Sequence, residues 1–120
     1  MDKKVYDLEE RTEKFARKAL DFIGKIPKTI ITIEIMKQLV RSSTSVGANY
    51  IEANECLGKK DFFMRIKICK KEAKETIFWL KLLEFNDNAL NQEREYLKNE
   101  ATELMKIFGS IAAKARNPNL

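Results

Sequence analysis

Residues 41–63, RSSTSVGANYIEANECLGKKDFF, hold the most unusual part of the sequence, a row of small residues followed by a basic turn. The first half has the three-four spacing of an amphipathic helix, with its apolar positions at Val46, Tyr50, Ala53 and Leu57. Small or polar residues form a neighbouring strip, namely Ser43, Gly47 and Asn54. A mid-helix Gly costs roughly 1 kcal/mol relative to Ala. Close approach of another backbone would explain Gly47; a locally weak helix is the alternative.

The second half of this stretch begins another helix. We expect Gly58 to take the left-handed position after the preceding helix, and Asp61 to lie in the first turn of the next one. A heptad stripe then continues through Phe62, Ile66, Cys69, Ala73, Thr76, Leu80 and Leu83. Four apolar residues fall outside this stripe and favour a subunit contact: Phe63, Ile77, Phe78 and Trp79.

The helix that ends near Cys56 should begin at a threonine cap, either Thr29 or Thr32. Its first residues, IITIEI, also suit a strand, but the later helical periodicity outweighs that alternative. Because Met36, Val40, Ser43 and Gly47 widen its apolar arc, this helix is either the most buried one or faces a second subunit.

Two further helices complete the pattern. The first follows a stripe of Val5, Leu8, Thr12, Phe15, Ala19, Phe22 and Ile26, broadened by Ala16, Leu20 and Ile23, and is ended by Pro27. The last follows the turn Asn86–Asn88, ends at Asn117-Pro118, and has its inner face at Leu90, Leu97, Ala101, Leu104, Phe108, Ile111 and Ala115. Short turns between four helices predict a single all-α domain over residues 1–120, an antiparallel up-down-up-down bundle.

Composition excludes several classes of function. The 120 residues contain no His, which removes the commonest general base and the usual transition-metal ligand, so we expect no enzyme, metal or cofactor. No apolar run approaches the ~20 residues that span a bilayer, and the N-terminus lacks the apolar core of a signal peptide. We therefore expect a cytosolic protein without membrane contact, whose Cys56 and Cys69 stay reduced.

Positive charge is concentrated in one window. The net charge of the chain is +5, and residues 59–74 alone hold seven basic and two acidic side chains. Lys60, Lys67, Lys71 and Lys74 fall within a narrow arc of their helix, as their separations predict. Such a stripe can follow a phosphate backbone, although solvated lysine faces are common. The candidate nucleic-acid-binding residues are Lys59, Lys60, Lys67, Lys70, Lys71 and Lys74.

A second polar group lies along one edge of the helix before this window. Arg41, Ser45 and Glu52 follow one another there at helical spacing, and Asn49 lies beside them. Arg41 and Glu52 could anchor a polar network with neighbouring helices or subunits. Catalysis there would need Lys or Glu as the base, since the chain has no His.

Two segments, QLVRSSTSVGANYIEA (residues 38–53) and KKDFFMRIKICKKEAKETIFWLKLL (residues 59–83), strongly resemble the 23S rRNA intervening-sequence protein family. The family pattern is matched by Leu39, Arg41, Ser42, Ser45, Val46, Asn49 and Glu52, and later by Asp61-Phe62. The likeness extends over nearly the whole chain, through residues 26–29 and the run ELMKIFGSI. Ala53 stands where many members have Gly, which affects packing.

The resemblance implies a left-handed four-helix bundle that assembles into a homopentamer. It implies little about activity: genes of some relatives lie within insertions in large-subunit ribosomal RNA genes, and a related retroelement accessory protein is a basic pentamer that binds nucleic acid. No catalytic residues are carried across. The leading hypothesis is a non-enzymatic pentamer that binds RNA or DNA, with the second helix and the outlying aromatics at subunit contacts. An adaptor for a protein partner and, more remotely, an enzyme with an inter-subunit Lys/Glu site are the alternatives.

Overall fold

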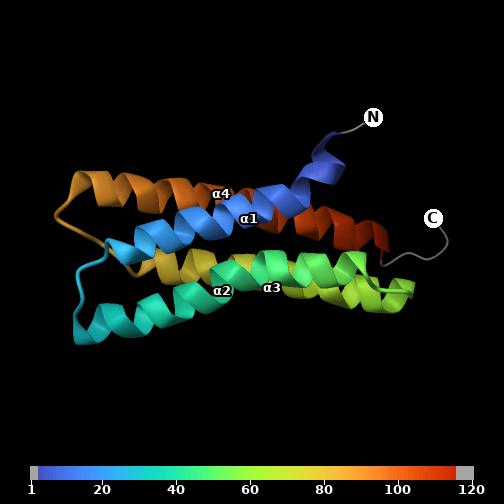
Figure 1. Cartoon of the computed structure of the whole chain (residues 1–120), viewed down its shortest axis with the longest axis horizontal. Coiled ribbons are helices and arrows are strands. Elements are labelled where there is room, and N and C mark those ends of the chain that lie inside the picture. Colours follow the sequence, from blue (N-terminus) through green and yellow to red (C-terminus); the bar gives the residue numbers. More distant parts are fainter. Residues whose placement is uncertain (1–2, 116–120) are drawn as a thin grey trace.

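The computed structural model describes the backbone of residues 3–115 and the side chains of residues 8–115. This part of the chain forms four helices and no strand: α1 (Lys3–Gly24), α2 (Ile30–Asn54), α3 (Lys59–Lys81) and α4 (Asn88–Ala115). Consecutive helices run antiparallel, and α1 and α4 lie together over α2 and α3 (Figure 1). Each helix contacts its two neighbours in the ring α1-α2-α3-α4, with the sparsest contact between α1 and α4. The predicted up-down-up-down arrangement is confirmed.

The apolar face of α1 is the predicted one, with a correction at one position. The buried side chains are Leu8, Thr12, Phe15, Ala19, Phe22, Ile23 and Ile26. Leu20, expected to broaden this stripe, is instead 44% exposed. The helix ends at Gly24, two residues before the predicted end, and Pro27 follows the turn. Two predictions concern side chains or residues outside the described ones: Val5 in the apolar stripe of α1, and Asn117-Pro118 as the end of the last helix.

Both candidate threonines cap α2. Thr32 N–H donates to Thr29 Oγ1 at 3.0 Å, and Thr29 N–H donates to Thr32 Oγ1 at 2.8 Å. This reciprocal capping box satisfies two backbone donors that a helix N-terminus otherwise leaves unpaired. The segment IITIEI follows this cap and forms the first turns of α2, so the strand alternative is wrong.

Two predictions about the turn between α2 and α3 are wrong. The α2 helix ends at Asn54, so Leu57 lies beyond it, fully exposed, and does not extend the apolar face. Gly58 has φ −111° and ψ 152°, an extended conformation, because it is the N-cap of α3 rather than the residue that terminates α2. The predicted place of Asp61 in the first turn of α3 is confirmed.

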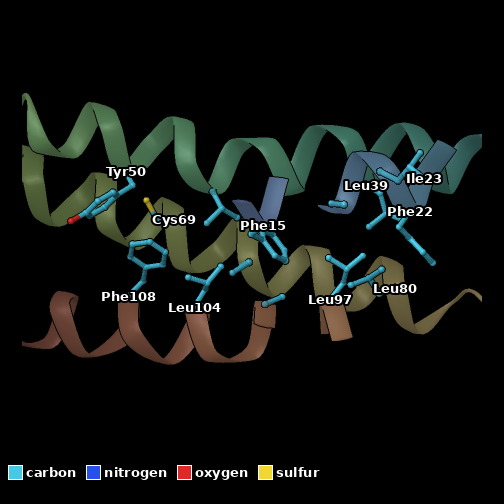
Figure 2. Packing of buried hydrophobic residues seen from close by; sticks show 14 of the residues in the cluster. Phe15, Phe22, Ile23, Leu39, Tyr50, Cys69, Leu80, Leu97, Leu104 and Phe108 are labelled. Atoms are coloured by element: carbon cyan, nitrogen blue, oxygen red, sulfur yellow. The ribbon is translucent and has the colours of Figure 1, made fainter. Parts of the chain in front are cut away.

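Side chains from all four helices meet in one core (Figure 2). Tyr50 of α2 packs against Phe108 of α4 with ring centroids 5.6 Å apart, and Phe22 of α1 packs edge-on against Phe85 at 6.0 Å. The α3 heptad stripe is buried from Ile66 to Leu83, and Phe62 is half-buried. On α4, Ala112 is buried, whereas Ile111 and Ala115 at the end of the predicted stripe are half-buried.

The apolar residues outside the α3 stripe differ in exposure. Phe63, Ile77 and Trp79 are half-buried and pack against the core of their own chain. Their own chain therefore covers part of each side chain, and the predicted subunit contact stays a prediction. Phe78 is the one of the four that is exposed, at 52%. Both cysteines are free thiols: Cys69 is buried and Cys56 is half-buried.

The turn before α4 is capped by the predicted polar residues. Asp87 Oδ1 accepts hydrogen bonds from the backbone N–H groups of Ala89 at 2.9 Å and Leu90 at 3.3 Å. An aspartate at this position satisfies free N–H groups and lies favourably at the positive end of the helix dipole. No helix among the described residues is long and apolar enough to cross a membrane.

Candidate nucleic-acid interface

The outward face of α3 carries the lysines singled out from the sequence. All six are exposed: Lys59, Lys60, Lys67, Lys70, Lys71 and Lys74. The opposite face of α3 enters the core at Ile66, Ala73 and Leu80, which fixes the lysine side toward solvent. We call these six residues the lysine surface. Helix geometry alone therefore brings together side chains that are up to fifteen positions apart in sequence.

Seven of the fourteen other basic side chains that the structure describes form an ion pair with a carboxylate. Arg11 bonds Glu100 at 2.7 Å, and Lys25 bonds Glu93 at 3.0 Å. Further pairs are Arg17–Glu13, Lys37–Glu34, Arg41–Glu72, Arg94–Glu95 and Lys98–Glu95. Within the lysine surface, only Lys71 approaches a described carboxylate, Glu72 Oε2, at 4.0 Å. Five of the six lysines of the lysine surface therefore form no ion pair with a described carboxylate.

Apolar groups lie among these cations. A hollow of about 360 Å³ is lined by Met64 and Ile68 together with Lys67, Lys70, Lys71 and Lys74. Lys67 Nζ lies 5.5 Å from the centre of the Phe63 ring, within the range of a cation–π contact. Lysine stems and the side chains of Met64 and Ile68 therefore give this surface an apolar floor beneath its charged rim.

The second group of candidate residues forms a polar network between α2 and α3. Arg41 Nη1 donates to Glu72 Oε1 at 2.9 Å, and its Nη2 donates to Glu75. The Glu72 side chain is only 9% exposed, so Arg41 neutralises a carboxylate that water scarcely reaches. The hydrogen bond that Arg41 donates to Glu72, and after it the one that it donates to Glu75, raises the pKa of the guanidinium.

The other members of this group have separate roles. Asn49 Oδ1 accepts a hydrogen bond from Arg65 Nη1 at 2.8 Å and thereby joins α2 to α3. Ser45 Oγ donates to the carbonyl of Arg41 within its own helix, at 2.6 Å. Glu52 lines a hollow with Arg65 at the end of the α2–α3 pair, and its carboxylate forms no hydrogen bond or ion pair with another described residue. The network is therefore built around Arg41 and Asn49, without the predicted participation of Glu52.

Comparison with known proteins identifies the family and the fold of the chain. The sequence matches the family described as 23S rRNA-intervening sequence protein over residues 4–110. The chain belongs to this family. A similar fold occurs in the crystal structure of a protein of unknown function from the S23 ribosomal protein family of Bacteroides thetaiotaomicron. That protein is 30% identical, with a TM-score of 0.74, and the match covers 87% of this chain and 96% of the other. No curated protein matches the sequence.

In this member of the 23S rRNA-intervening sequence protein family, the Arg41 and Asn49 positions of the family pattern hold α2 to α3. No group of three His, Cys, Asp or Glu side chains in the described residues is arranged to hold a metal ion. Reasoning from sequence did not connect the lysine surface with the exposed or half-buried apolar residues beside it: it assigned Phe78 to a subunit contact and did not single out Met64 or Ile68. Their spacing along α3 places them on the same side of the helix as the lysines. Only the packed structure shows that α2 and α4 leave them at least partly exposed.

Proposed function

We propose that this protein is a non-enzymatic, cytosolic homo-oligomer, in the form of a pentamer, that binds nucleic acid without sequence specificity through the lysine surface. The observation that carries the proposal is the set of six exposed lysines on one helix face, nearly all without a carboxylate partner among the described residues. Phosphate contacts by such cations release condensed counterions and provide most of the free energy of non-specific binding.

Assembly is supported by a different surface, on α2. Ile33, Val40 and Ile51 are spaced seven and eleven residues apart, so they lie in one row on the helix. Their exposed fractions are 38%, 40% and 50%. A row of exposed apolar residues is a natural subunit contact, and it leaves the α3 lysines accessible. In a pentamer five lysine surfaces act together, which multiplies weak individual contacts.

An oligomeric adaptor for a protein partner, without nucleic acid, is the second candidate. It is favoured by apolar side chains at the end of the bundle where α2 begins and α3 ends. Ile30, Ile31 and Leu82 are 89%, 71% and 51% exposed, and the last two border a hollow of about 550 Å³. Exposed apolar patches of this kind are typical of protein contacts.

Salt dependence of binding tests the leading proposal. We expect a duplex of generic sequence to bind at low salt, with log Kobs falling linearly in log salt by roughly 0.9 per neutralised phosphate. Changing Lys67, Lys71 and Lys74 together to Gln should flatten this slope, since each removed cation removes a phosphate contact. Fluorescence anisotropy of a labelled duplex over a salt series measures both slopes.

A matched variant distinguishes the effect of losing lysines from the lysine surface from the effect of lowering the net charge of the protein. Lys14, Lys106 and Lys114 are exposed on α1 and α4, and changing them to Gln removes the same three charges. This control should retain the wild-type slope, and sedimentation should show the same oligomer for all three proteins. Equal slopes for both triple variants, or no binding by the wild type at low salt, would exclude nucleic-acid binding at this surface and favour the adaptor.

A further inference from the structure

Phe78 is an exposed aromatic residue within the lysine surface. It follows Lys67, Lys71 and Lys74 at separations of eleven, seven and four, which return close to the same angle on an α-helix. About half of its surface is accessible, whereas Trp79, the next residue, is half-buried against the core. At about 1.5 Å per residue, Phe78 lies about 6 Å beyond Lys74 along the helix axis.

The surroundings of Phe78 make it a poor subunit contact. Burying its ring against another copy would bring the neighbouring lysines into the same interface. Charged groups, lysine above all, are depleted from interface cores because their desolvation is costly. The α2 row at Ile33, Val40 and Ile51 offers an alternative apolar contact. Phe78 is thus exposed where cations would hold a polyanion.

We propose that the lysine surface binds single-stranded nucleic acid in preference to duplex, with Phe78 as a stacking platform for an unpaired base. This inference rests on the proposed function and deepens it. Bases within a duplex are stacked on one another and cannot reach a side chain on a helix face, whereas unpaired bases can turn toward an aromatic ring. Lys67, Lys71 and Lys74 bind the phosphates of the same strand, and every base has a face that can stack, so the preference carries no sequence specificity.

The fluorescence of Trp79, which lies beside Phe78, can report this contact. Trp79 is the single tryptophan of the chain, and its ring centroid lies 5.0 Å from that of Phe78, with the two planes inclined by 70°. A base stacked on Phe78 therefore comes close to the indole. We expect single-stranded oligonucleotides to change Trp79 fluorescence, and duplexes that occupy only the lysines to change it much less.

The test compares a labelled 20-nucleotide single strand of mixed sequence with the corresponding duplex, using wild type and Phe78→Ala. We expect the substitution to weaken single-strand binding by about 5-fold to 100-fold, the usual effect of removing one stacking side chain. Duplex affinity should change by less than about 2-fold, since phosphate contacts by Lys67, Lys71 and Lys74 remain.

Three matched variants make the result specific. Phe78→Tyr keeps the ring and should bind as wild type does, whereas Phe78→Leu keeps apolar surface without a ring and should behave as Phe78→Ala does. Tyr96→Ala removes an aromatic residue of similar exposure, 46%, on α4, outside the lysine surface, and should leave both affinities unchanged. All four variants should have the sedimenting mass of the wild type.

Failure of this inference differs from failure of the proposed function. Equal loss of single-strand and duplex affinity in Phe78→Ala, no loss of either, or a changed oligomeric mass would overturn the stacking role and leave electrostatic binding intact. Absence of binding to both probes at low salt would overturn the proposed function and this inference together.

Discussion

Gly47 of α2 lies directly against Thr12 of α1. A Cβ atom at Gly47 would lie 2.9 Å from Thr12 Oγ1 and 3.1 Å from Thr12 Cβ, closer than side-chain atoms pack. Thr12 is 1% exposed, and its hydroxyl donates to the carbonyl of Leu8 at 2.8 Å, so the side chain cannot turn aside freely. The absence of a side chain at Gly47 thus allows α1 and α2 to approach at this point.

Changing Gly47 to Ala should therefore destabilise the fold. Ala is favoured over Gly in a helix interior by roughly 1 kcal/mol, and this gain offsets only part of the cost of the clash with Thr12. Overpacking a tight contact typically costs about 1–3 kcal/mol, so we expect the net loss to be about 1–2 kcal/mol. Urea unfolding at fixed protein concentration measures it. Adding Thr12→Ala should reduce the cost of Gly47→Ala, and a Gly47→Ala protein more stable than wild type would contradict the close contact.

Truncation of Leu80 tests the core of α3. Leu80 is 1% exposed, and replacing it with Ala should destabilise the fold by about 2–5 kcal/mol, through lost burial and the cavity left behind. Leu82, two residues further on, is 51% exposed and serves as the matched control. Leu82→Ala should change the free energy of unfolding by less than about 0.5 kcal/mol. Similar effects of the two substitutions would show that the assigned inward face of α3 is wrong.

Arg41 should matter more to stability than an exposed arginine in an ion pair. Changing Arg41 to Met leaves Glu72 nearly buried without its cation, and we expect a loss of about 1–3 kcal/mol. Arg17 pairs with Glu13 where both side chains are well exposed, at 75% and 64%. Arg17→Met should cost less than about 1 kcal/mol, as is usual for surface pairs. Thermal and urea unfolding compare the variants, and equal losses would argue against a role for the Arg41 network.

The two thiols should differ in reactivity. Burial raises the pKa of Cys69 to about 12, so at pH 8 this thiol stays protonated and unreactive. In a Cys56→Ser protein, we expect a thiol reagent to react with Cys69 only after unfolding, whereas Cys69→Ser should leave a reactive Cys56. Rapid labelling of Cys69 in the folded protein would contradict its burial.

The same pKa predicts a loss of stability in alkali. The folded pKa of Cys69 lies above the ordinary thiol value of 9.0, so the unfolded chain releases this proton first. The contribution of the protonated thiol is complete below about pH 9 and is lost as the pH rises toward 12. Cys69→Ser should therefore show a weaker decline of stability over this range than wild type.

Assembly should depend on the exposed apolar row of α2. Sedimentation equilibrium at micromolar concentration should give a species nearest to five times the 14.0 kDa chain mass. Ile51→Glu should lower this mass, because a charge within an apolar contact is costly. Leu20→Glu, at a residue of α1 that is 44% exposed, should leave it unchanged. A monomer at all concentrations would contradict the proposed oligomer.

Much of the fold could be predicted because its signals are local. Thr29 and Thr32 cap α2 through a hydrogen-bonding pattern that involves only nearby residues, and Asp87 caps α4 in the same way. The heptad stripe of α3 follows from helix periodicity alone. Predictions at Leu57 and Gly58 failed because nothing near Asn54 in the sequence marks the residue at which α2 ends.

The candidate site was only partly predictable. Helix phase was sufficient to place the lysines on one exposed face of α3. Whether a cation is paired with a carboxylate can depend on another helix, as for Arg11 with Glu100, 89 residues away in sequence. The exposure of neighbouring aromatic residues also could not be predicted from the sequence. Phe78 is exposed and Trp79 packs against the core, because the helices beside α3 cover one and not the other.

The sequence by itself therefore determined four helices, their inward faces and a band of positive charge, because periodicity and capping act within a few residues. The tertiary structure decided which polar groups meet: Thr12 lies against Gly47, Arg41 pairs with Glu72, and only Lys71 of the lysine surface approaches a described carboxylate. These pairings depend on the rotation and spacing of helices relative to one another, which packing of the whole core sets and no short segment specifies.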